Sequence, residues 1–577
     1  MNDIDLRKLL VLFLDCQTTG ASPRRGQVIE IAWARSDFLH TADLASAHVN
    51  SYLLRLPPET EIPNRVQVIT GIGPAEVERG HEPRDVWQRL RVEAEEIATV
   101  NRYEKCPTVI HFAKFETPFL FDLHEKHADG KVFPFKILCT HVIAKRIFPQ
   151  LPRRSIRAMA GYFGYSLGQI RRSRDHVLAT AIVWQQMVSV LREQFRIMTF
   201  VELQQWLDQP VVMVSPERIY PMVTELKRAI SDKPGVYRMY RSNADILYIG
   251  KATSLRQRVN SYFRKSSRHG EHILEMLSQA KQIDVTETET VLEAAILESD
   301  EIKRLSPPYN IALRGNERDV WFCSADLSEF STRPNRKCRI GPFISQEPMQ
   351  RLAGIMRMIT MHSETADEEL LDAIGIPENY APDMPCIRQG WDMFLSCHEE
   401  LLHSKSVNQA LRVLGQELWL QRQAEKDLQI EESDEFVLES IKVPVWSPES
   451  ICRLLESNVV HGIHAIRRAR WLVLLSESTL GYEEVVGKNR GRFVIAFDRG
   501  QVLFRRRIKS DDVPVPMGQA RAFEDRQRSF DLMTFDRMRV VTMEMRKIAA
   551  SNGWIRLRLS PDNILDSEAL LKVFKWV

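Results

Sequence analysis

Residues 234–310 hold an ordered run of short segments that constrains the fold more tightly than any other part of the chain. Two strand-like segments, a helix-like segment, a third strand-like segment and a second helix-like segment follow one another at close spacing. In chain order these segments are PGVYRMY, DILYIGK, LRQRVNSYF, QIDVTET and VLEAAILESDEIKRL. The pattern predicts a small, compact α/β domain.

Within this run, PGVYRMY, LYIGKA, LRQRVNSYF and ILESDEIKRLSPPYN resemble the GIY-YIG nuclease domain of UvrC-type and Cho-type proteins. The resemblance covers the whole domain and implies hydrolysis of a phosphodiester bond in DNA. That reaction needs an activated water, neutralisation of charge at phosphorus and help for the leaving oxygen. A divalent ion can supply the last two. The resemblance implies Mg²⁺ or Mn²⁺ as the ion and Glu298 as its carboxylate ligand.

The resemblance also implies roles for the other motif residues. Tyr237 is expected to be the general base, Tyr248 to position the nucleophile or the phosphate, and Arg258 to hold the phosphate with its planar fork. Four further positions are expected to support the site: Lys251 as a point charge, Gly235 and Gly250 through tight backbone geometry, and Asn310 as a tie at the end of the domain. Taken alone, each of these residues more often has a structural role than a catalytic one. Their order and spacing together favour an active site.

A basic stretch with aromatic residues between the charges follows the second motif. Its members are Arg256, Tyr262, Phe263, Arg264, Lys265 and Arg268. This composition fits binding of the phosphate backbone without reading of bases. The alternative is a solvated charged face, and the neighbouring hydrolytic site makes a DNA groove the better interpretation.

A second pattern lies near the amino terminus, where the hydrophobic run LLVLFLD ends in Asp15 and continues as CQTTG. Strand-like and helix-like segments alternate through residues 9–196, which predicts an α/β or mixed domain. FLDCQTTG, RVQVITGIG, VIHFAKFETPFL and RDHVLATAIVW together resemble the DnaQ-like exonuclease superfamily. The resemblance implies an RNase H-like fold, four acidic ligands for two metal ions, and a histidine as general base.

Several of these expected ligands are replaced. Asp15 matches the first, Gln17 stands at the second, and Ala181 stands where the last aspartate is expected. Glu116 replaces an aspartate, and His176 matches the general base. Two of four carboxylates therefore remain, and a neutral amide is a weak ligand for Mg²⁺. We expect a degenerate exonuclease site in a domain kept for binding DNA or a protein partner.

Asp175 is a candidate substitute for the missing aspartate, but a helix with about 3.6 residues per turn points it to a different face from position 181. The basic character of the domain favours DNA binding. The arginines concerned are Arg153, Arg154, Arg157, Arg171, Arg172 and Arg174.

The chain is expected to be multidomain, α/β and α+β, because 577 residues exceed the size of one hydrophobic core. The expected parts are a DnaQ-like domain (1–205), a linker (206–228), the GIY-YIG domain (229–318), a mainly helical UvrC/Cho-like extension (319–430) and a C-terminal α+β domain (431–577). The extension contains RIGPFISQEPMQRLAGIMRMI, which resembles the segment that follows the GIY-YIG domain in UvrC-like proteins. In the last part, ARWLVLLSES and RGRFVIAFDRGQVLFRRRI are strand candidates, and SFDLMTFDRMRVVTMEMRKIAA is a helix candidate.

Composition limits the compartment and the chemistry. The longest apolar runs are far too short to span a bilayer and no leader pattern is present, so we expect a cytoplasmic protein. The eight cysteines lack paired close spacing, which predicts reduced thiols. The net charge of +3 neither argues for nor excludes nucleic acid as a partner.

The expected function is a divalent-metal-dependent endonuclease that makes a single-strand incision in a process like nucleotide-excision repair. The implied partners are DNA and either a UvrB-like damage-loading protein or other replication and repair proteins, with no membrane. Two alternatives remain. One is a dual nuclease that retains 3′–5′ exonuclease activity, and the other is a non-catalytic DNA-binding scaffold.

Overall fold

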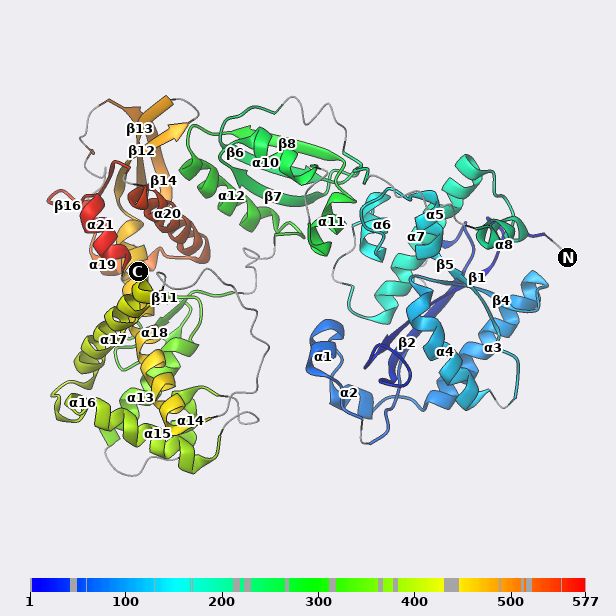
Figure 1. Cartoon of the computed structure of the whole chain (residues 1–577), viewed down its shortest axis with the longest axis horizontal. Helices are drawn as coiled ribbons and strands as arrows, with labels where there is room; N and C mark the ends of the chain where they lie inside the picture. The colour runs from blue at the N-terminus through cyan, green and yellow to red at the C-terminus, as the bar shows by residue number, and fades with distance from the viewer. Residues whose placement is uncertain are drawn as a thin grey trace. The chain divides into compact units, whose positions relative to one another are not determined.

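The computed structural model describes most of the chain (Figure 1). The described residues are 3–41, 49–58, 60–128, 130–166, 168, 170–210, 218–222, 230–264, 269–310, 318–361, 367–376, 382–429, 446–486, 489–509, 513–514, 521–551 and 553–575. The chain divides into two compact units. The first comprises Met1–Asp232, Tyr237–Thr286 and Pro307–Ile311, and the second comprises Lys233–Val236, Glu287–Ser306 and Ala312–Val577.

A five-stranded sheet of order β3-β2-β1-β4-β5 forms the centre of the N-terminal region (Figure 1). Its strands are β1 (Val11–Thr18), β2 (Val28–Ser36), β3 (Asn50–Leu53), β4 (Cys106–Ile110) and β5 (Phe135–Cys139). Pairing is antiparallel between β1 and β2 and between β2 and β3, and parallel between β1 and β4 and between β4 and β5. This mixed sheet agrees with the expected RNase H-like fold.

Helices cover both faces of this sheet because side chains alternate along its strands. Val11 and Phe13 of β1 enter one hydrophobic cluster with α5 to α8, whereas Leu12 and Leu14 enter a second cluster with α3 and α4. The helices are α1 (Asn64–Thr70), α2 (Pro74–Glu78), α3 (Pro83–Asn101), α4 (Ala113–His127), α5 (Thr140–Ile147), α6 (Ile156–Tyr162), α7 (Ser173–Phe195) and α8 (Phe200–Asp208).

A three-stranded sheet of order β7-β6-β8 follows. Its strands are β6 (Gly235–Tyr240), β7 (Ile246–Ala252) and β8 (Gln282–Glu287), and the helices are α10 (Leu255–Tyr262), α11 (Glu271–Leu277) and α12 (Val291–Leu305). Ser254 and Thr290 cap α10 and α12 by accepting hydrogen bonds from the third residue along. The strand and helix pattern predicted for this region is confirmed, and α11 is an addition.

The next region has a small sheet of order β10-β9-β11 and a group of helices. Its elements are β9 (Trp321–Cys323), β10 (Phe330–Ser331), β11 (Ile340–Phe343), α13 (Glu347–Met361), α14 (Asp367–Ile374), α15 (Met384–Cys397), α16 (Glu400–His403), α17 (Val407–Gln429) and α18 (Pro448–Leu475). One buried hydrophobic cluster joins these helices to β9 and β11. The mainly helical character predicted after the GIY-YIG region is therefore confirmed.

The strand predicted at ARWLVLLSES is wrong, because most of this segment forms the end of α18. The helix begins where Ser447 accepts a hydrogen bond from the backbone N–H of Ser450, with Pro448 at its first position. Near its other end, Trp471, Leu472, Val473 and Leu475 are buried, and Leu474 is partly buried. A short, continuous apolar run has the same hydrophobic pattern in a buried helix and in a buried strand, which explains the error.

The C-terminal region has an antiparallel sheet of order β14-β13-β12-β15-β16. Its elements are β12 (Thr479–Val486), β13 (Asn489–Asp498), β14 (Gln501–Ile508), α19 (Phe523–Arg528), α20 (Leu532–Ala550), β15 (Ile555–Ser560), β16 (Asn563–Leu565) and α21 (Ser567–Phe574). RGRFVIAFDRGQVLFRRRI forms the β13–β14 hairpin, with Arg499 and Gly500 at positive φ in its turn. The strands predicted there and the helix α20 are confirmed.

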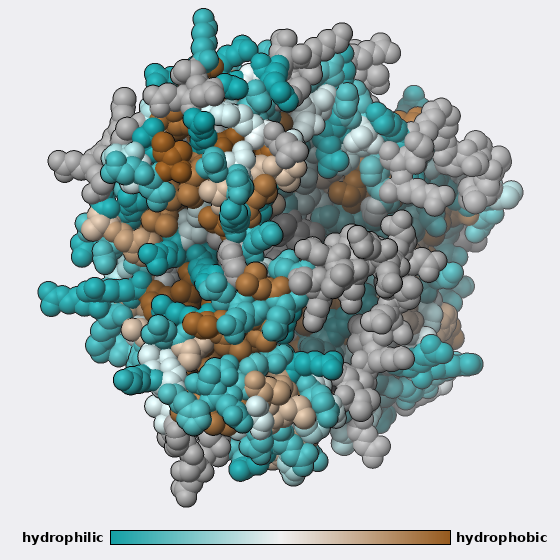
Figure 2. Space-filling model, turned by 60° about the vertical axis from the view of Figure 1, so that its left-hand side comes forward, coloured by the Kyte–Doolittle hydropathy of each residue, from teal (hydrophilic) through white to brown (hydrophobic). Residues whose placement is uncertain are grey.

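No helix in the described part of the chain is long and apolar enough to cross a membrane. Hydrophilic side chains cover most of the face seen in Figure 2, with smaller hydrophobic areas between them. All eight cysteines are free thiols.

Glu484 on β12 gives the stability of the second unit a dependence on pH. Its carboxylate accepts a hydrogen bond from the backbone N–H of Val291 at 2.6 Å, and burial raises its pKa from 4.5 to about 7. The folded state therefore holds this proton more tightly than the unfolded chain does. Stability from this group is greatest below pH 4.5 and falls as the pH rises to about 7.

Glu484→Gln keeps the acceptor oxygen but removes the charge. We expect the variant to unfold at a higher temperature than the parent at pH 8 and to lose most of this advantage at pH 5, with a difference of at most about 3 kcal/mol. Thermal unfolding followed at both pH values measures the effect. An equal shift at pH 5 and pH 8 contradicts the assignment.

Candidate active site

Two tyrosines on neighbouring strands form the centre of the candidate site. Tyr237 on β6 is 1% exposed, and its ring centroid lies 6.0 Å from that of Tyr248 on β7. Gly250 on β7 leaves the space that both rings use: a Cβ there would lie 2.4 Å from the Tyr237 hydroxyl oxygen and 2.8 Å from Cε1 of Tyr248. Glycine at this position therefore allows both rings to pack against the strand.

Hydrogen bonds connect Tyr237 to α10. The hydroxyl oxygens of Tyr237 and Tyr262 lie 2.9 Å apart, and Arg258 Nη2 donates to the Tyr262 hydroxyl at 3.3 Å. Burial raises the pKa of Tyr237 well above its usual value, so its phenol stays protonated at neutral pH. In this state Tyr237 can orient a water by hydrogen bonding, but it must lose its own proton before it can act as a base.

The residues expected to bind DNA have different environments. Arg256 is engaged with the segment before β6, because it pairs with Asp232 at 3.2 Å. Tyr262 is 4% exposed, so its ring belongs to the tyrosine cluster and is not a surface on which a base could stack. Arg258 and Arg264 are exposed. Lys265 and Arg268 lie outside the described residues.

Asn310 joins the end of the domain to β7. Its side-chain oxygen accepts a hydrogen bond from the backbone N–H of Ile249 at 2.9 Å, and its side-chain N–H donates to the Ile249 carbonyl at 2.7 Å. Both backbone groups of the residue between Tyr248 and Gly250 are therefore held. Lys251 follows on the same strand, and Gly235 begins β6.

Glu298 lies in the middle of α12 and is partly exposed. Among the described residues, no group of three or more His, Cys, Asp or Glu side chains is placed to hold a metal ion. A single accessible carboxylate fits Mg²⁺ or Mn²⁺ where water and phosphate oxygens complete the coordination shell. The donor chemistry of Glu298 is therefore compatible with the implied ion.

The exonuclease-like residues come together around Asp15 on β1. Its Oδ1 lies 3.6 Å from Nδ1 of His176, and Gln17 Nε2 donates to its Oδ2 at 3.5 Å. Burial raises the pKa of Asp15 to about 6 and the pKa of Glu116 well above its usual value. The charge of Asp15 raises the pKa of Glu116 further. The two remaining carboxylates thus share a buried environment that disfavours their ionised forms.

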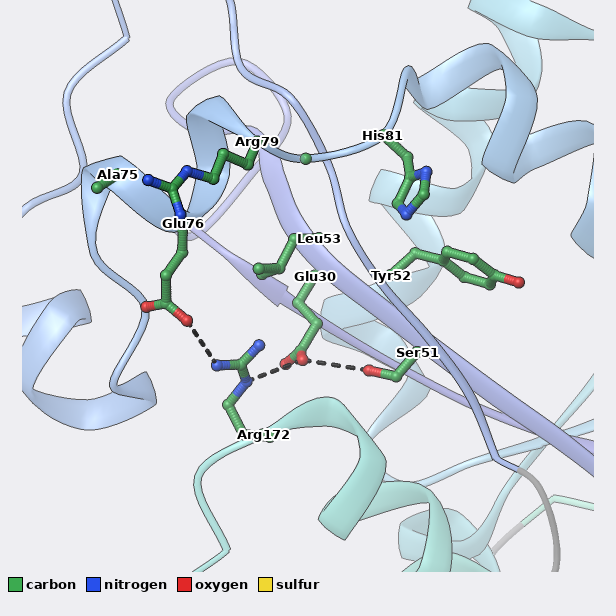
Figure 3. A pocket seen from close by; sticks show the side chains of 10 residues that line it. Glu30, Ser51, Tyr52, Leu53, Ala75, Glu76, Arg79, His81 and Arg172 are labelled. Carbon is green, nitrogen blue, oxygen red and sulfur yellow. Dashed lines mark hydrogen bonds and ion pairs between the residues drawn. The ribbon is translucent and has the colours of Figure 1, made fainter.

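Glu30 is an acidic residue at this site that the sequence analysis missed. It lies opposite Gln17 in the β1–β2 pairing and is 1% exposed. Its carboxylate accepts hydrogen bonds from Arg172 Nε at 2.9 Å (Figure 3) and from the backbone N–H of Ser173 at 2.8 Å. Glu30 therefore holds the first turn of α7, the helix that bears His176. The available signal was a single carboxylate inside the apolar strand VIEIAWA.

Glu30 and Arg172 also border a pocket of about 480 Å³ (Figure 3). Arg172 reaches Glu76 across it, at 3.5 Å. Both acidic and basic side chains line this pocket, among them Arg79 and His81. The pocket therefore lacks the uniformly positive lining that would attract a phosphate group.

The remaining exonuclease-like positions do not restore the missing ligands. Ala181 is fully buried in the hydrophobic cluster under α7. Asp175 accepts hydrogen bonds from the backbone N–H groups of Arg171 and Arg172, so it caps the start of the helix. Glu30 is engaged by Arg172 and Ser173, so Asp15 and Glu116 remain as carboxylate donors, and this donor set does not fit two divalent ions.

Several arginines that suggested DNA binding by this domain have structural partners. Arg153 pairs with Glu271 at 2.9 Å, and Arg154 donates from Nε to the Phe148 carbonyl at 2.9 Å. Arg172 is bound to Glu30. Part of the basic character of the domain therefore stabilises the fold, which weakens the charge argument for DNA binding.

Gly250→Ala tests the packing of the two tyrosines. The added methyl group must displace both rings, and we expect cleavage of one strand in a supercoiled plasmid to slow by roughly 10²-fold, since small misplacements of catalytic groups have effects of this size. The matched control is Gly270→Ala, where a Cβ meets no atom within 4 Å. Equal rates for both variants, each folded by circular dichroism, contradict the proposed packing role.

Two family models match the chain. The UvrC-like GIY-YIG domain matches residues 233–311, and the exonuclease family matches residues 12–169. The first range includes Tyr237 and Glu298, and the second includes Asp15 and Glu116.

Similar proteins are found among curated sequences and solved structures. The UvrABC system protein C of Alkalilimnicola ehrlichii is 41% identical over 116 residues, which are 20% of this chain and 19% of that protein. The protein of the same name from Vibrio cholerae is 29% identical over 225 residues, 36% of this chain and 35% of that protein. The GIY-YIG N-terminal endonuclease domain of UvrC from Thermotoga maritima, solved with magnesium, is 28% identical, and the match covers 16% of this chain and 100% of that domain with a TM-score of 0.14.

The chain spans 19% and 35% of the lengths of these two curated relatives. The two matched ranges do not overlap, and both matched families are nucleases that hydrolyse phosphodiester bonds. The chain therefore contains an exonuclease-family domain followed by a UvrC-like GIY-YIG domain.

Proposed function

We propose that this protein is a divalent-metal-dependent DNA endonuclease that makes a single-strand incision during DNA repair. The observation that carries the proposal is the hydrogen-bonded cluster of Tyr237, Tyr262 and Arg258, packed against Gly250 within the matched GIY-YIG range. The exonuclease-family domain binds DNA or a protein partner in this proposal, because its donor set does not fit two metal ions.

Each residue of the cluster has a place in the proposed reaction. Arg258 is exposed and binds the scissile phosphate through the N–H groups not used by Tyr262. Tyr237 and Tyr248 orient a water for attack on phosphorus. A Mg²⁺ or Mn²⁺ ion held by Glu298 supplies charge neutralisation when it is bound. The water oxygen bonds to phosphorus as the P–O3′ bond breaks, leaving a 3′-hydroxyl and a 5′-phosphate.

The protonation state of Tyr237 limits how it acts. Because burial raises the pKa of this phenol, a phenolate is unfavourable unless positive charge lies nearby. The positive charge of Arg258 lowers the pKa of Tyr237 and so opposes part of this effect. We infer that Tyr237 orients the water by hydrogen bonding as a neutral phenol.

The proposed substrate is duplex DNA that contains a lesion, and the proposed compartment is the cytoplasm. The curated relatives are named as components of the UvrABC system. Delivery of this protein by a UvrB-like partner is a proposal on the same basis. A nicking assay on a duplex with one defined lesion, with and without UvrB, tests this dependence directly.

Glu298→Ala and Tyr237→Phe test the nuclease site. We expect each to abolish nicking of lesion-bearing DNA in Mg²⁺, the first through loss of the metal ligand and the second through loss of the hydroxyl that orients water. Glu568→Ala, an exposed glutamate on α21, is the matched control and should cut at the parent rate. If the parent cuts no substrate with any divalent ion, the protein is the non-catalytic scaffold instead.

Asp15→Ala tests residual exonuclease activity. We expect the ends of the nicked products to be the same for the variant and the parent in Mg²⁺ and in Mn²⁺, because the buried pair of Asp15 and Glu116 cannot hold two ions. Product lengths on a sequencing gel give the measurement. Stepwise shortening from 3′ ends that survives Glu298→Ala but disappears in Asp15→Ala would establish the dual nuclease.

A further inference from the structure

Helix α12 contributes to the hydrophobic core of the C-terminal domain, which we define as β12 to α21. Leu292 and Ile296 of α12 belong to the same buried cluster as Tyr482, Phe535 and Met538 of that domain. Helix α12 packs along α20 within the second compact unit. The helix that bears Glu298 is therefore part of the core of a domain with no assigned role.

Charged groups fix the C-terminal half of α12 to α20. Arg537 is 4% exposed and forms a forked pair with Asp300, with Nε 3.0 Å from Oδ1 and Nη2 2.9 Å from Oδ2. Its Nη1 also donates to the Gly500 carbonyl at 2.6 Å. The neighbouring Asp536 forms a buried ion pair with Lys303. A planar fork with three hydrogen bonds allows little rotation of the helix at this end.

Contacts with the sheet fix the N-terminal end of α12. The hydroxyl oxygens of Thr290 and Tyr482 lie 2.9 Å apart. Glu484 accepts a hydrogen bond from the first backbone N–H of the helix. Arg505 of β14 pairs with Glu293 at 3.0 Å. Both ends of α12 are therefore attached to the C-terminal domain.

Glu298 lies on the other side of the helix from these contacts. At about 100° per residue, it is about 140° from Glu293 and Lys303 and about 160° from Ile296 and Asp300. The C-terminal domain thus holds one face of α12 and leaves the opposite face to Glu298. This arrangement fixes the face of α12 from which Glu298 projects.

We propose that the C-terminal domain positions Glu298 for metal binding by holding α12, and that Arg537 and Asp536 are positioning residues. The metal-binding role of Glu298 in this proposal rests on the proposed nuclease function. The packing of α12 on the C-terminal domain is independent of that function. One protein carboxylate gives a metal ion few constraints, so the direction of that carboxylate strongly affects affinity. A helix held along its whole length provides that direction.

Hydrogen–deuterium exchange of the full chain without metal tests the positioning contact. We expect Arg537→Ala to accelerate exchange in peptides covering residues 291–305 and to leave the first sheet unchanged. Asp300→Asn, at a partly exposed position, is a milder second variant that removes the same pair. Met543→Ala is the matched control, because Met543 lies on α20 and is 50% exposed. Unchanged exchange in α12 for both pair variants overturns the proposal.

The dependence of nicking on Mg²⁺ tests the consequence for the site. We expect Arg537→Ala to raise the Mg²⁺ concentration for half-maximal nicking by roughly tenfold, the size typical of lost support around a metal ligand, and to change the rate at saturating Mg²⁺ much less. Arg537→Lys, which keeps the charge but not the fork, should give a smaller shift. A uniform loss of rate with unchanged Mg²⁺ dependence overturns the positioning role.

The two experiments separate this proposal from the nuclease function. A parent that cuts and a Glu298→Ala variant that does not cut, together with an unchanged Arg537→Ala variant, overturn the positioning role alone. A parent that does not cut overturns the nuclease function and, with it, the role assigned to Glu298.

Discussion

The ion pair between Arg537 and Asp300 helps to determine how the second unit is built, because it joins segments 237 residues apart. Arg537 is 4% exposed, so removing Asp300 would leave a largely buried guanidinium without its charged partner, which is costly. The sequence of α12 belongs to the GIY-YIG pattern, but one of its faces belongs to the core of the C-terminal domain. The matched range of residues 233–311 is therefore a sequence unit that does not coincide with a unit of packing.

Burial of charge also explains the state of the exonuclease-family domain. Gln17 contacts Asp15 and lies opposite Glu30, so a glutamate at this position would bring three carboxylates together. Such a group needs bound cations to offset its repulsion. Glutamine removes that need, and Glu30 stabilises the start of α7 instead. The domain therefore carries fewer acidic groups whose repulsion bound cations would have to offset.

Local patterns in the sequence predicted the elements around Tyr237, Tyr248 and Glu298, because the periodicity of strands and helices is set by neighbouring residues. They also predicted strand structure in RGRFVIAFDRGQVLFRRRI, which forms β13 and β14. They failed at ARWLVLLSES, where an apolar run within a long, capped helix has no visible period. The tertiary partners of Tyr262 and Arg256 could not be predicted from the sequence either. Charge and aromatic character do not show whether a side chain faces water or a neighbouring segment.

Glu30 and Arg537 show why the rest of the site could not be predicted. Each is an ordinary charged residue in its local sequence, and each acquires its role from a partner more than 140 residues away. A motif identifies groups that contact the reacting atoms, since chemistry restricts their type and order. The groups that hold those residues in place are restricted only by geometry, and many residue types could satisfy it. The C-terminal domain illustrates the difference: its sequence carries no recognisable catalytic pattern, yet its contacts with α12 constrain the direction of Glu298.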